Sequence, residues 1–236
     1  MNILRGLLFN VLYATSVILF SLPALLIAPL LNYQARLRYL TALPRGIQGL
    51  LALTCGITFR IEGRENIPPT PFVLISNHQS TWETLVLSYL FTPITAVAKK
   101  ELTYIPFFGW VLNLGRPIVI DRKRKQSALK EILRQGQQRL SDGVSVVIFP
   151  EGTRVPVAET RPHLPGGAML ACKAGVPVLP VVHNAGLFWP AHRLGKNPGQ
   201  ITIRIGSPIP TEGRSAKELN QQLEQWINEQ KQLLPR

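Results

Sequence analysis

The chain of 236 residues is long enough for one globular domain with a short additional segment, and several separate domains are not favoured. Its 26 Lys and Arg against 13 Asp and Glu give a formal net charge of +13, which favours an anionic partner such as a membrane surface, a phosphorylated metabolite or nucleic acid. The two cysteines, Cys55 and Cys172, lie far apart in apolar surroundings, so a disulfide framework, a zinc site and a catalytic thiol are disfavoured.

The first predicted element is a long hydrophobic helix. No charged residue occurs from Gly6 to Ala35, and the apolar run from Leu7 to Leu31 is longer than the roughly 20 residues that cross a bilayer. Pro23 and Pro29 interrupt the run. We therefore expect a helix from about Ile3 to Leu22, followed by a break.

The sequence leaves the membrane topology of this helix open. It is compatible with a full span, with a hairpin in one leaflet, with a cleaved signal peptide, which is weakest because no small-x-small cleavage site ends the run, and with a buried core helix. More basic residues follow the helix than precede it, which predicts a main domain on the cytoplasmic side of the inner membrane. Gln34 to Cys55 mixes arginines with leucines and predicts an amphipathic helix at the lipid headgroups, kinked at Pro44.

The rest of the chain alternates short apolar runs with helical segments. Near-continuous apolar strands are typical of a sheet covered on both faces, so the predicted class is α/β, with a mostly parallel or mixed central sheet flanked by helices. We expect residues 1–56 to be membrane-anchoring helices and residues 57–236 to be the α/β domain. The predicted strands are residues 72–76, 94–98, 117–120, 144–149, 176–182 and 201–205, and the predicted helices are residues 83–91, 125–140, 167–174 and 215–233.

Ligands of open α/β sheets bind beyond the carboxyl ends of the strands, and three such ends carry polar chemistry here. The segments are Asn77 to Glu83, Lys99 to Glu101 and Pro150 to Arg154. Although they are distant in sequence, we expect them to converge on one edge of the sheet.

His78 is a candidate general base, because its ordinary pKa of roughly 6.5 lets it accept a proton at neutral pH. Glu83 is five residues on, about 140° around a helix, so the two share a site only if His78 lies on the turn and Glu83 in the first helical turn. A structural interpretation competes: Ser80 to Glu83 matches a capping box, in which Glu83 bonds to the Ser80 N–H.

Arg154 offers a planar fork that matches phosphate oxygens, and Lys100 adds a second positive charge from another strand end. Gly152 allows a tight turn before Arg154. The sequence lacks the nucleotide-binding glycine loops, the G-x-S-x-G elbow and any recognisable nucleic-acid module, so hydrolase and nucleic-acid functions lack support. The basic run from Arg122 to Lys125 is interpreted as a contact to lipid headgroups or to the acyl donor.

Four ordered segments together resemble the motifs of the glycerolipid acyltransferase family, and most closely its 1-acyl-sn-glycerol-3-phosphate acyltransferase branch. The resemblance covers about Glu62 to Pro208. The segments are His78 to Glu83, Lys100-Glu101 leading to Ile105-Pro106-Phe107-Phe108-Gly109-Trp110, Phe149 to Arg154, and Val176 to Val181.

The resemblance implies that His78 deprotonates the sn-2 hydroxyl of lysophosphatidic acid while Glu83 orients the imidazole. The alkoxide then attacks a fatty acyl thioester of CoA or acyl carrier protein, without an acyl-enzyme. Lys100 and Arg154, with the turn of Glu151, Gly152 and Thr153, are expected to bind the acceptor phosphate. No metal or other cofactor is expected, and anionic membrane lipid is an expected partner whereas nucleic acid is not.

Two departures from the family pattern bear on the site. The first motif of the family ends in Asp, but here it ends in Glu83, and Leu164-Pro165 stand where members often have Phe-Lys. Two alternatives are kept: the same chemistry on another lysolipid or on glycerol 3-phosphate, and a non-catalytic protein that binds anionic lipid.

Overall fold

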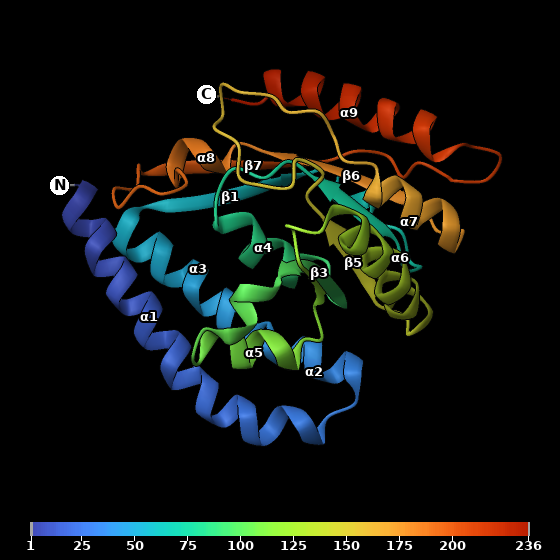
Figure 1. The fold of residues 1–236 in the computed structure, drawn as a ribbon. Helices are drawn as coiled ribbons and strands as arrows, with labels where there is room; N and C mark the ends of the chain where they lie inside the picture. Colours follow the sequence, from blue (N-terminus) through green and yellow to red (C-terminus); the bar gives the residue numbers. More distant parts are fainter. Residues whose placement is uncertain (1, 236) are drawn as a thin grey trace.

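The structure is a computed structural model that describes residues 2–235, apart from the side chain of Lys125. Within these residues a seven-stranded sheet has the order β1-β7-β6-β2-β5-β3-β4 (Figure 1). β6, β2, β5, β3 and β4 are parallel, whereas β7 runs antiparallel to β6 and parallel to β1. The predicted α/β fold with a mixed sheet is confirmed. The strands are β1 Ile57–Glu62, β2 Val73–Ser76, β3 Ile94–Lys99, β4 Ile118–Ile120, β5 Ser145–Ile148, β6 Val178–His183 and β7 Gly199–Ile205.

Helices cover both faces of the sheet. The described residues form nine α-helices and three short 3-10 turns, and all four helices predicted in the body of the chain are present. The helices are α1 Asn2–Ile27, α2 Tyr33–Leu40, α3 Ala42–Cys55, α4 Trp82–Leu90, α5 Phe108–Leu114, α6 Lys125–Ser141, α7 Gly166–Ala174, α8 Ala185–Phe188 and α9 Ala216–Gln232, and the 3-10 turns are η1 Ala28–Leu30, η2 Arg64–Asn66 and η3 Lys100–Tyr104.

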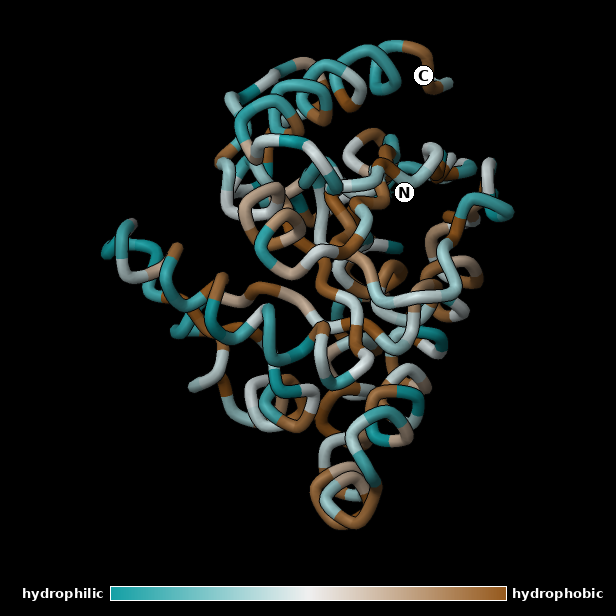
Figure 2. Tube along the Cα trace, turned by 90° about the vertical axis from the view of Figure 1, so that its right-hand side faces the viewer, coloured by the Kyte–Doolittle hydropathy of each residue, from teal (hydrophilic) through white to brown (hydrophobic). Residues whose placement is uncertain are grey.

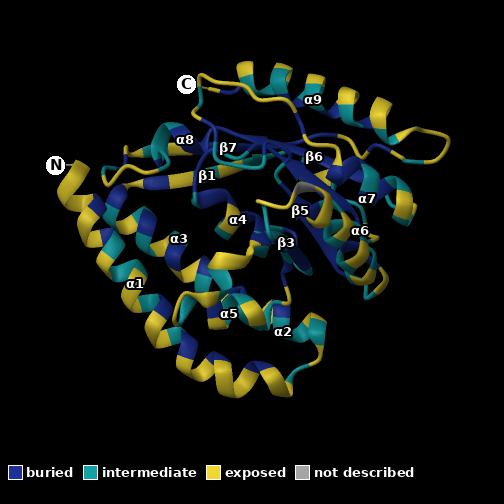
Figure 3. Cartoon of the chain, viewed as in Figure 1, coloured by how far each residue is buried: buried dark blue, intermediate teal, exposed yellow. Residues whose placement is uncertain are grey.

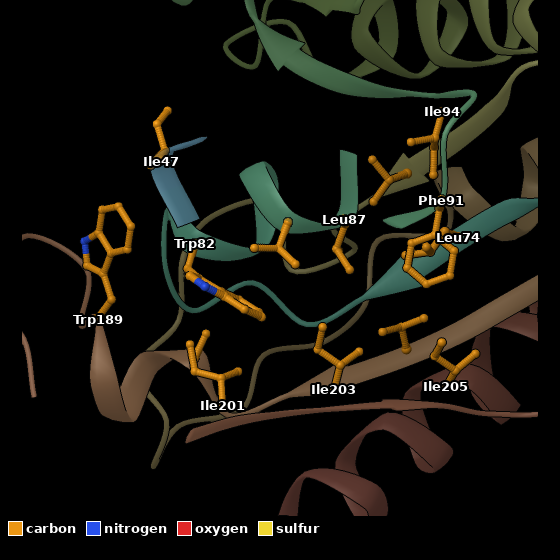
Figure 4. Close-up of a cluster of buried hydrophobic side chains, with 14 of the residues drawn as sticks. Ile47, Leu74, Trp82, Leu87, Phe91, Ile94, Trp189, Ile201, Ile203 and Ile205 are labelled. Atoms are coloured by element: carbon orange, nitrogen blue, oxygen red, sulfur yellow. The ribbon is translucent and has the colours of Figure 1, made fainter. Parts of the chain in front are cut away.

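Alternate residues of the central strands face two separate hydrophobic cores. Val73 and Ile75 of β2 lie in a core with α6, α7 and α9, while Leu74 between them lies in a second core with α3 and α4. Figure 4 shows this second core, in which Trp82 of α4 lies near Ile201 of β7. Since both faces are covered, every residue of β2 and β5 is buried, which explains the uninterrupted apolar runs in the sequence.

The sequence prediction was wrong at two points in the N-terminal helices. α1 does not break before Pro23 but continues to Ile27, because Ser21 and Ala24 remain fully buried and this packing outweighs the hydrogen bond that Pro23 cannot donate. The predicted kink at Pro44 is instead a break at Thr41 between α2 and α3. Pro44 lies in the first turn of α3, where a backbone N–H has no partner within the helix anyway.

β1 was also missed by the sequence analysis. Its burial alternates because it is the edge strand, and Arg60 and Glu62 interrupt the apolar pattern. The carboxylate of Glu62 accepts a hydrogen bond at 2.8 Å from Arg204 on the neighbouring β7, so these charges serve the pairing of the two strands.

α1 packs along its length on the body of the protein and presents an apolar outer face. Figure 3 shows buried patches along α1 on the side of α3 and α5, and exposed residues on the other. Figure 2 shows hydrophobic turns at the bottom of the view, at the height where α1 ends in Figure 1. By length and composition alone, residues 2–30 are the one described helical stretch that can cross a membrane, with a mean hydropathy of 2.2. The buried stripe is Gly6, Phe9, Val17, Ser21 and Ala24.

A buried lysine fastens the beginning of α1 to the α/β domain. The ammonium of Lys196 lies 4.9 Å from the ring centroids of both Phe9 and Trp189, and it donates a hydrogen bond at 2.9 Å to the side chain of Asn10. Burial lowers the pKa of Lys196, and the partners offset part of that cost. Phe9 thus belongs to the same core as the central sheet.

Candidate active site

The parallel strands bring the predicted segments to one edge of the sheet. His78 follows β2, Lys100 follows β3 and Glu151 follows β5. β2 pairs with β5, and β5 pairs with β3, in the same direction, so all three carboxyl ends lie together. The convergence expected from the sequence is therefore present. Lys100 itself is exposed at the start of η3.

His78 and Glu83 form a pair in which Glu83 is fully buried and His78 is partly exposed. Nδ1 of His78 lies 2.7 Å from Oε1 of Glu83, and Glu83 is the second residue of α4, in the first helical turn as the spacing requires. Nδ1–H donates to the carboxylate, so in the neutral imidazole Nε2 is the atom that can accept a proton. The longer Glu side chain therefore reaches the imidazole in place of the Asp of the family motif.

Glu83 performs the capping and the pairing role with the same oxygen. Its Oε1 also accepts hydrogen bonds from the backbone N–H groups of Gln79 and Ser80, at 2.8 and 2.7 Å. Burial raises the pKa of the Glu83 carboxyl, but His183, His78 and the Ser80 N–H outweigh burial and hold the pKa below its ordinary value. The predicted capping box is only half formed: Glu83 accepts from the Ser80 N–H, but α4 begins after Thr81 and the Ser80 hydroxyl accepts from the Trp82 N–H instead of the Glu83 N–H.

His183 lies behind the pair at the end of β6 and is completely buried. Its Nε2 is 2.9 Å from the carbonyl oxygen of Asn77 and 4.0 Å from Oε2 of Glu83, and two further hydrogen bonds join its backbone to the Asn77 side chain. Burial lowers the pKa of His183. Because Nε2 donates to the Asn77 carbonyl, His183 packs behind Glu83 without a hydrogen bond to the carboxylate.

The backbone of His78 is fixed by the turn after β5. Its N–H donates to Oε2 of Glu151 at 2.7 Å, and its carbonyl accepts from the N–H of Val155 at 2.7 Å. The imidazole stacks on the ring of Phe149, with centroids 4.3 Å apart. Backbone and ring are therefore both held in one orientation before any substrate binds.

Glu151 holds the backbone of His78 rather than standing free for a ligand. Its carboxylate is buried, and its Oε1 lies 3.9 Å from the ammonium of Lys231 in α9. Burial raises the pKa of Glu151, while the His78 N–H and Lys231 favour the ionised form. A direct contact of Glu151 with substrate remains a prediction.

Two arginines lie beside the pair. Arg154 donates a hydrogen bond at 3.1 Å to the hydroxyl of Thr81, three residues after His78, and Arg122 donates to the carbonyl of Gly152. Burial lowers the pKa of Arg122, the carboxylate of Glu101 raises it, and the charge of Arg154 lowers it, so two cations and one carboxylate share a small region. Such a pair of guanidinium groups is suited to phosphate oxygens.

The turn between these groups is built around Gly152. Its φ of +70° is rare for residues with a side chain, and an added Cβ would lie 3.1 Å from Leu164. Thr153 is partly exposed in the same turn. Contacts of Gly152 and Thr153 with a ligand remain predictions.

Sequence reasoning missed three members of the site. Arg122 was predicted only as part of a run that contacts lipid headgroups or the acyl donor, and its guanidinium donates to the Gly152 carbonyl while Arg124 is exposed. The position of Arg122 directly after a strand end was the signal for it. His183 and Lys231 reach the site through packing across the fold, for which the sequence holds no local signal.

A surface hollow of about 660 Å³ lies elsewhere, at the opposite edge of the sheet beside the amino ends of β2 and β6. Its lining holds the cations Arg134 and Lys173 but no histidine and no carboxylate. General base chemistry is therefore placed at the carboxyl edge.

Comparison with known proteins identifies the family of the chain. A model of the family described as Acyltransferase matches residues 58–184. The chain is 44% identical to the 1-acyl-sn-glycerol-3-phosphate acyltransferase of Pseudomonas aeruginosa, over 96% of this chain and 90% of that protein. A protein of the same name from Saccharomyces cerevisiae is 31% identical over 84% of this chain and 66% of its own length.

A solved structure supports the fold over the whole chain. The crystal structure of the 1-acyl-sn-glycerophosphate (LPA) acyltransferase PlsC from Thermotoga maritima aligns with a TM-score of 0.81 at 25% identity. The alignment covers 98% of this chain and 95% of that chain, so it includes the N-terminal helices as well as the sheet.

Proposed function

The chain belongs to the acyltransferase family, and from this premise we propose that it transfers a fatty acyl group from a thioester to the sn-2 hydroxyl of 1-acyl-glycerol 3-phosphate, giving phosphatidic acid. The observation that carries the proposal is the His78–Glu83 pair at 2.7 Å, beside the cations Arg122 and Arg154. A general base next to two guanidinium groups suits an acceptor that has both a hydroxyl group and a phosphate group.

In this mechanism Nε2 of His78 accepts the proton of the sn-2 hydroxyl as its oxygen attacks the thioester carbonyl. The new C–O bond forms, the C–S bond breaks, and the proton passes from His78 to the leaving thiolate. Glu83 stabilises the imidazolium while it exists. The nearby hydroxyl of Ser80 is buried and accepts a hydrogen bond from the Trp82 N–H, which supports direct transfer without an acyl-enzyme.

Arg122 and Arg154 are proposed to bind the acceptor phosphate, with Lys100, Gly152 and Thr153 at the margin of the same site. The donor is proposed to be acyl-CoA or acyl carrier protein, because both present the same thioester on a phosphopantetheine arm. An assay that offers the two donors separately, at equal concentration, decides between them.

We further propose that α1 lies in one leaflet of the cytoplasmic membrane and does not cross it. The helix is packed sideways on α3 and α5, and Lys196 fastens its beginning to the α/β domain. At the other end, Tyr33 of α2 lies under the guanidinium groups of Arg116 and Arg139. A helix held at both ends against a charged domain cannot span a bilayer alone, whereas its exposed leucines can enter one leaflet.

The acceptor is tested by offering a labelled acyl thioester with lysophosphatidic acid, lysophosphatidylcholine or glycerol 3-phosphate in detergent or vesicles. We expect labelled phosphatidic acid to be the main product. Transfer to another acceptor alone would keep the chemistry but refute the proposed substrate. Transfer to none of them would favour a protein that binds anionic lipid without catalysis.

A further inference from the structure

The C-terminal helix α9 lies outside the segment that matches the family, yet one of its faces reaches the back of the active site. Asn220, Glu224 and Lys231 are four and seven residues apart, so they lie on the same side of the helix. Figure 1 shows the loop that follows β5 passing along α9. This polar stripe is next to the apolar residues by which α9 packs on the sheet.

The stripe holds the loop that follows the Glu151 turn. Asn220 donates to the carbonyl of His163 at 3.2 Å, and the Glu224 carboxylate accepts from the N–H of the same residue at 3.3 Å. Lys231 donates to the carbonyl of Glu159 at 3.2 Å. Three side chains of one helix are therefore used to fix a loop of the catalytic edge.

Lys231 also connects α9 with the catalytic histidine through one intermediate residue. Its ammonium lies 3.9 Å from Oε1 of Glu151, and Oε2 of Glu151 accepts the hydrogen bond from the His78 N–H at 2.7 Å. The side chain of Lys231 is 8% exposed and that of Glu151 is 2% exposed. The carboxylate thus bridges a cation on one side and the catalytic backbone on the other.

A carboxylate so deeply buried keeps its charge only with partners. Burial raises the pKa of Glu151, and burial lowers the pKa of Lys231, so each group supports the charged form of the other. The charged and titratable groups that act on Glu151 are Lys231 from α9, His78 from the turn after β2 and Glu83 from α4. Of these, Lys231 alone carries a permanent positive charge at neutral pH.

We propose that Lys231 is a positioning residue for acyl transfer: it holds the Glu151 carboxylate in place and ionised, and Glu151 in turn fixes the backbone of His78. This role rests on the proposed function, because it concerns the same general base. It gives α9 a part in catalysis although no residue of α9 touches the reacting atoms.

A kinetic comparison separates positioning from a general effect on the fold. Lys231→Met keeps most of the apolar stem but removes the charge, and Lys231→Arg keeps the charge. Lys217→Met is the matched control, because Lys217 is an exposed lysine of the same helix. We expect Lys231→Met to lower kcat about tenfold or more while the KM of both substrates stays within about twofold, since a small displacement of a catalytic group is costly. Lys231→Arg should recover most of the loss.

The pH profile adds a readout that a merely structural role would not move. Without the charge of Lys231, the pKa of Glu151 rises further above its ordinary value, so Glu151 takes up a proton at a higher pH. As the pH is lowered, the activity of Lys231→Met should therefore begin to fall at a higher pH than the activity of the wild type. An unchanged kcat and an unchanged acid limb in Lys231→Met would overturn the proposal.

A second measurement needs no substrate and so stands apart from the proposed function. The chain has four histidines, so protein labelled with ¹⁵N-histidine gives four backbone amide signals by NMR. We expect the His78 amide shift, assigned with His78→Asn, to titrate with Glu151 at a higher pH in Lys231→Met than in the wild type and Lys217→Met. Equal midpoints would refute the coupling. A shifted midpoint in a protein that does not acylate lysophosphatidic acid would keep the coupling and refute only the acceptor.

Discussion

Nδ1 of His78 and Oε1 of Glu83 lie 2.7 Å apart, although the residues are five positions apart in the sequence and a continuous helix would turn them away from each other. The contact exists because His78 lies in the connection after β2 and Glu83 lies in the first turn of α4. The Glu83 oxygen also accepts two backbone N–H groups, so the carboxylate is fixed before it meets the imidazole. The same carboxylate oxygen therefore pairs with the imidazole and accepts the N–H groups of the connection that leads into α4.

Replacing Glu83 should damage the chemistry more than substrate binding. We expect Glu83→Gln to lower kcat by about 10³–10⁴-fold, because the amide no longer fixes the tautomer or stabilises the imidazolium. Glu83→Asp keeps the charge but is one methylene shorter, so it should retain more activity than Glu83→Gln. Steady-state kinetics of both variants measure this order, and wild-type kcat in Glu83→Gln would contradict the pairing.

These kinetic comparisons should be made at a pH of about 6 to 8, which lies above the ordinary pKa values of carboxyl groups. The pKa of Glu83 lies below its ordinary value of 4.5, so its stabilising contribution is complete above that pH. The contribution is lost only as the pH falls through the lower folded value. Acid unfolding of the wild type should therefore include this loss, and Glu83→Gln should unfold with a weaker dependence on acid pH.

Substitution of the paired arginines should weaken acceptor binding. Arg154→Ala and Arg122→Met each remove a cation beside His78, and we expect the KM for lysophosphatidic acid to rise about tenfold or more for each, as the loss of one charged hydrogen bond predicts. Arg124→Ala is the control, because Arg124 belongs to the same basic run but its side chain is 80% exposed. If Arg154→Ala and Arg124→Ala give equal KM values, Arg154 does not belong to the phosphate site.

The attachment of α1 to the α/β domain can be tested by replacing two glycines, Gly6 and Gly49, separately with alanine. A Cβ added at Gly6 would lie 2.1 Å from the carbonyl oxygen of Leu194, so Gly6→Ala must push α1 away from the α/β domain. Gly49 in α3 has open space around its Cα, and Gly49→Ala should instead stabilise by about 0.5–1 kcal/mol. Thermal unfolding in detergent should show a lower Tm for Gly6→Ala and an equal or higher Tm for Gly49→Ala. Equal Tm values for Gly6→Ala and wild type would mean that the contact does not hold the helix.

The position of α1 in the membrane can be measured by cysteine labelling. We would place one new cysteine at Arg5, Gln34 or Lys217 in a Cys172→Ser background, in which the remaining Cys55 is buried, and add an impermeant thiol reagent to sealed vesicles. If α1 lies in one leaflet, all three positions react from the same side. If α1 spans the membrane, Arg5→Cys is protected when Lys217→Cys reacts.

The sheet could be predicted from the sequence wherever both faces of a strand are covered. β2 and β5 have no polar alternation, because each residue enters one of two cores. β1 was not predicted, because it is an edge strand in which Arg60 and Glu62 interrupt the apolar pattern. The course of α1 through Pro23 could not be predicted, because it depends on burial of Ser21 and Ala24 against other helices.

The site was predictable where the chemistry follows a strand directly. His78, Glu83 and Arg154 were found in this way, and the structure brings them together. His183 and Lys231 were not predicted, because the sequence around an isolated histidine or lysine does not indicate that it will lie close to Glu83 or Glu151. Only the packing of β6 and α9 gives these residues a place near the base.

The central claim is that His78 is the general base, and acyl transfer by one variant tests it most directly. His78→Asn should reduce the rate of phosphatidic acid formation at saturating donor by at least about 10²-fold, because the proton acceptor is lost. His192→Asn is the control, since His192 is an exposed histidine with a φ of +61° that asparagine tolerates. Loss of transfer in His78→Asn alone, with an unchanged Tm, is the predicted result. Near-wild-type transfer by His78→Asn would contradict the mechanism.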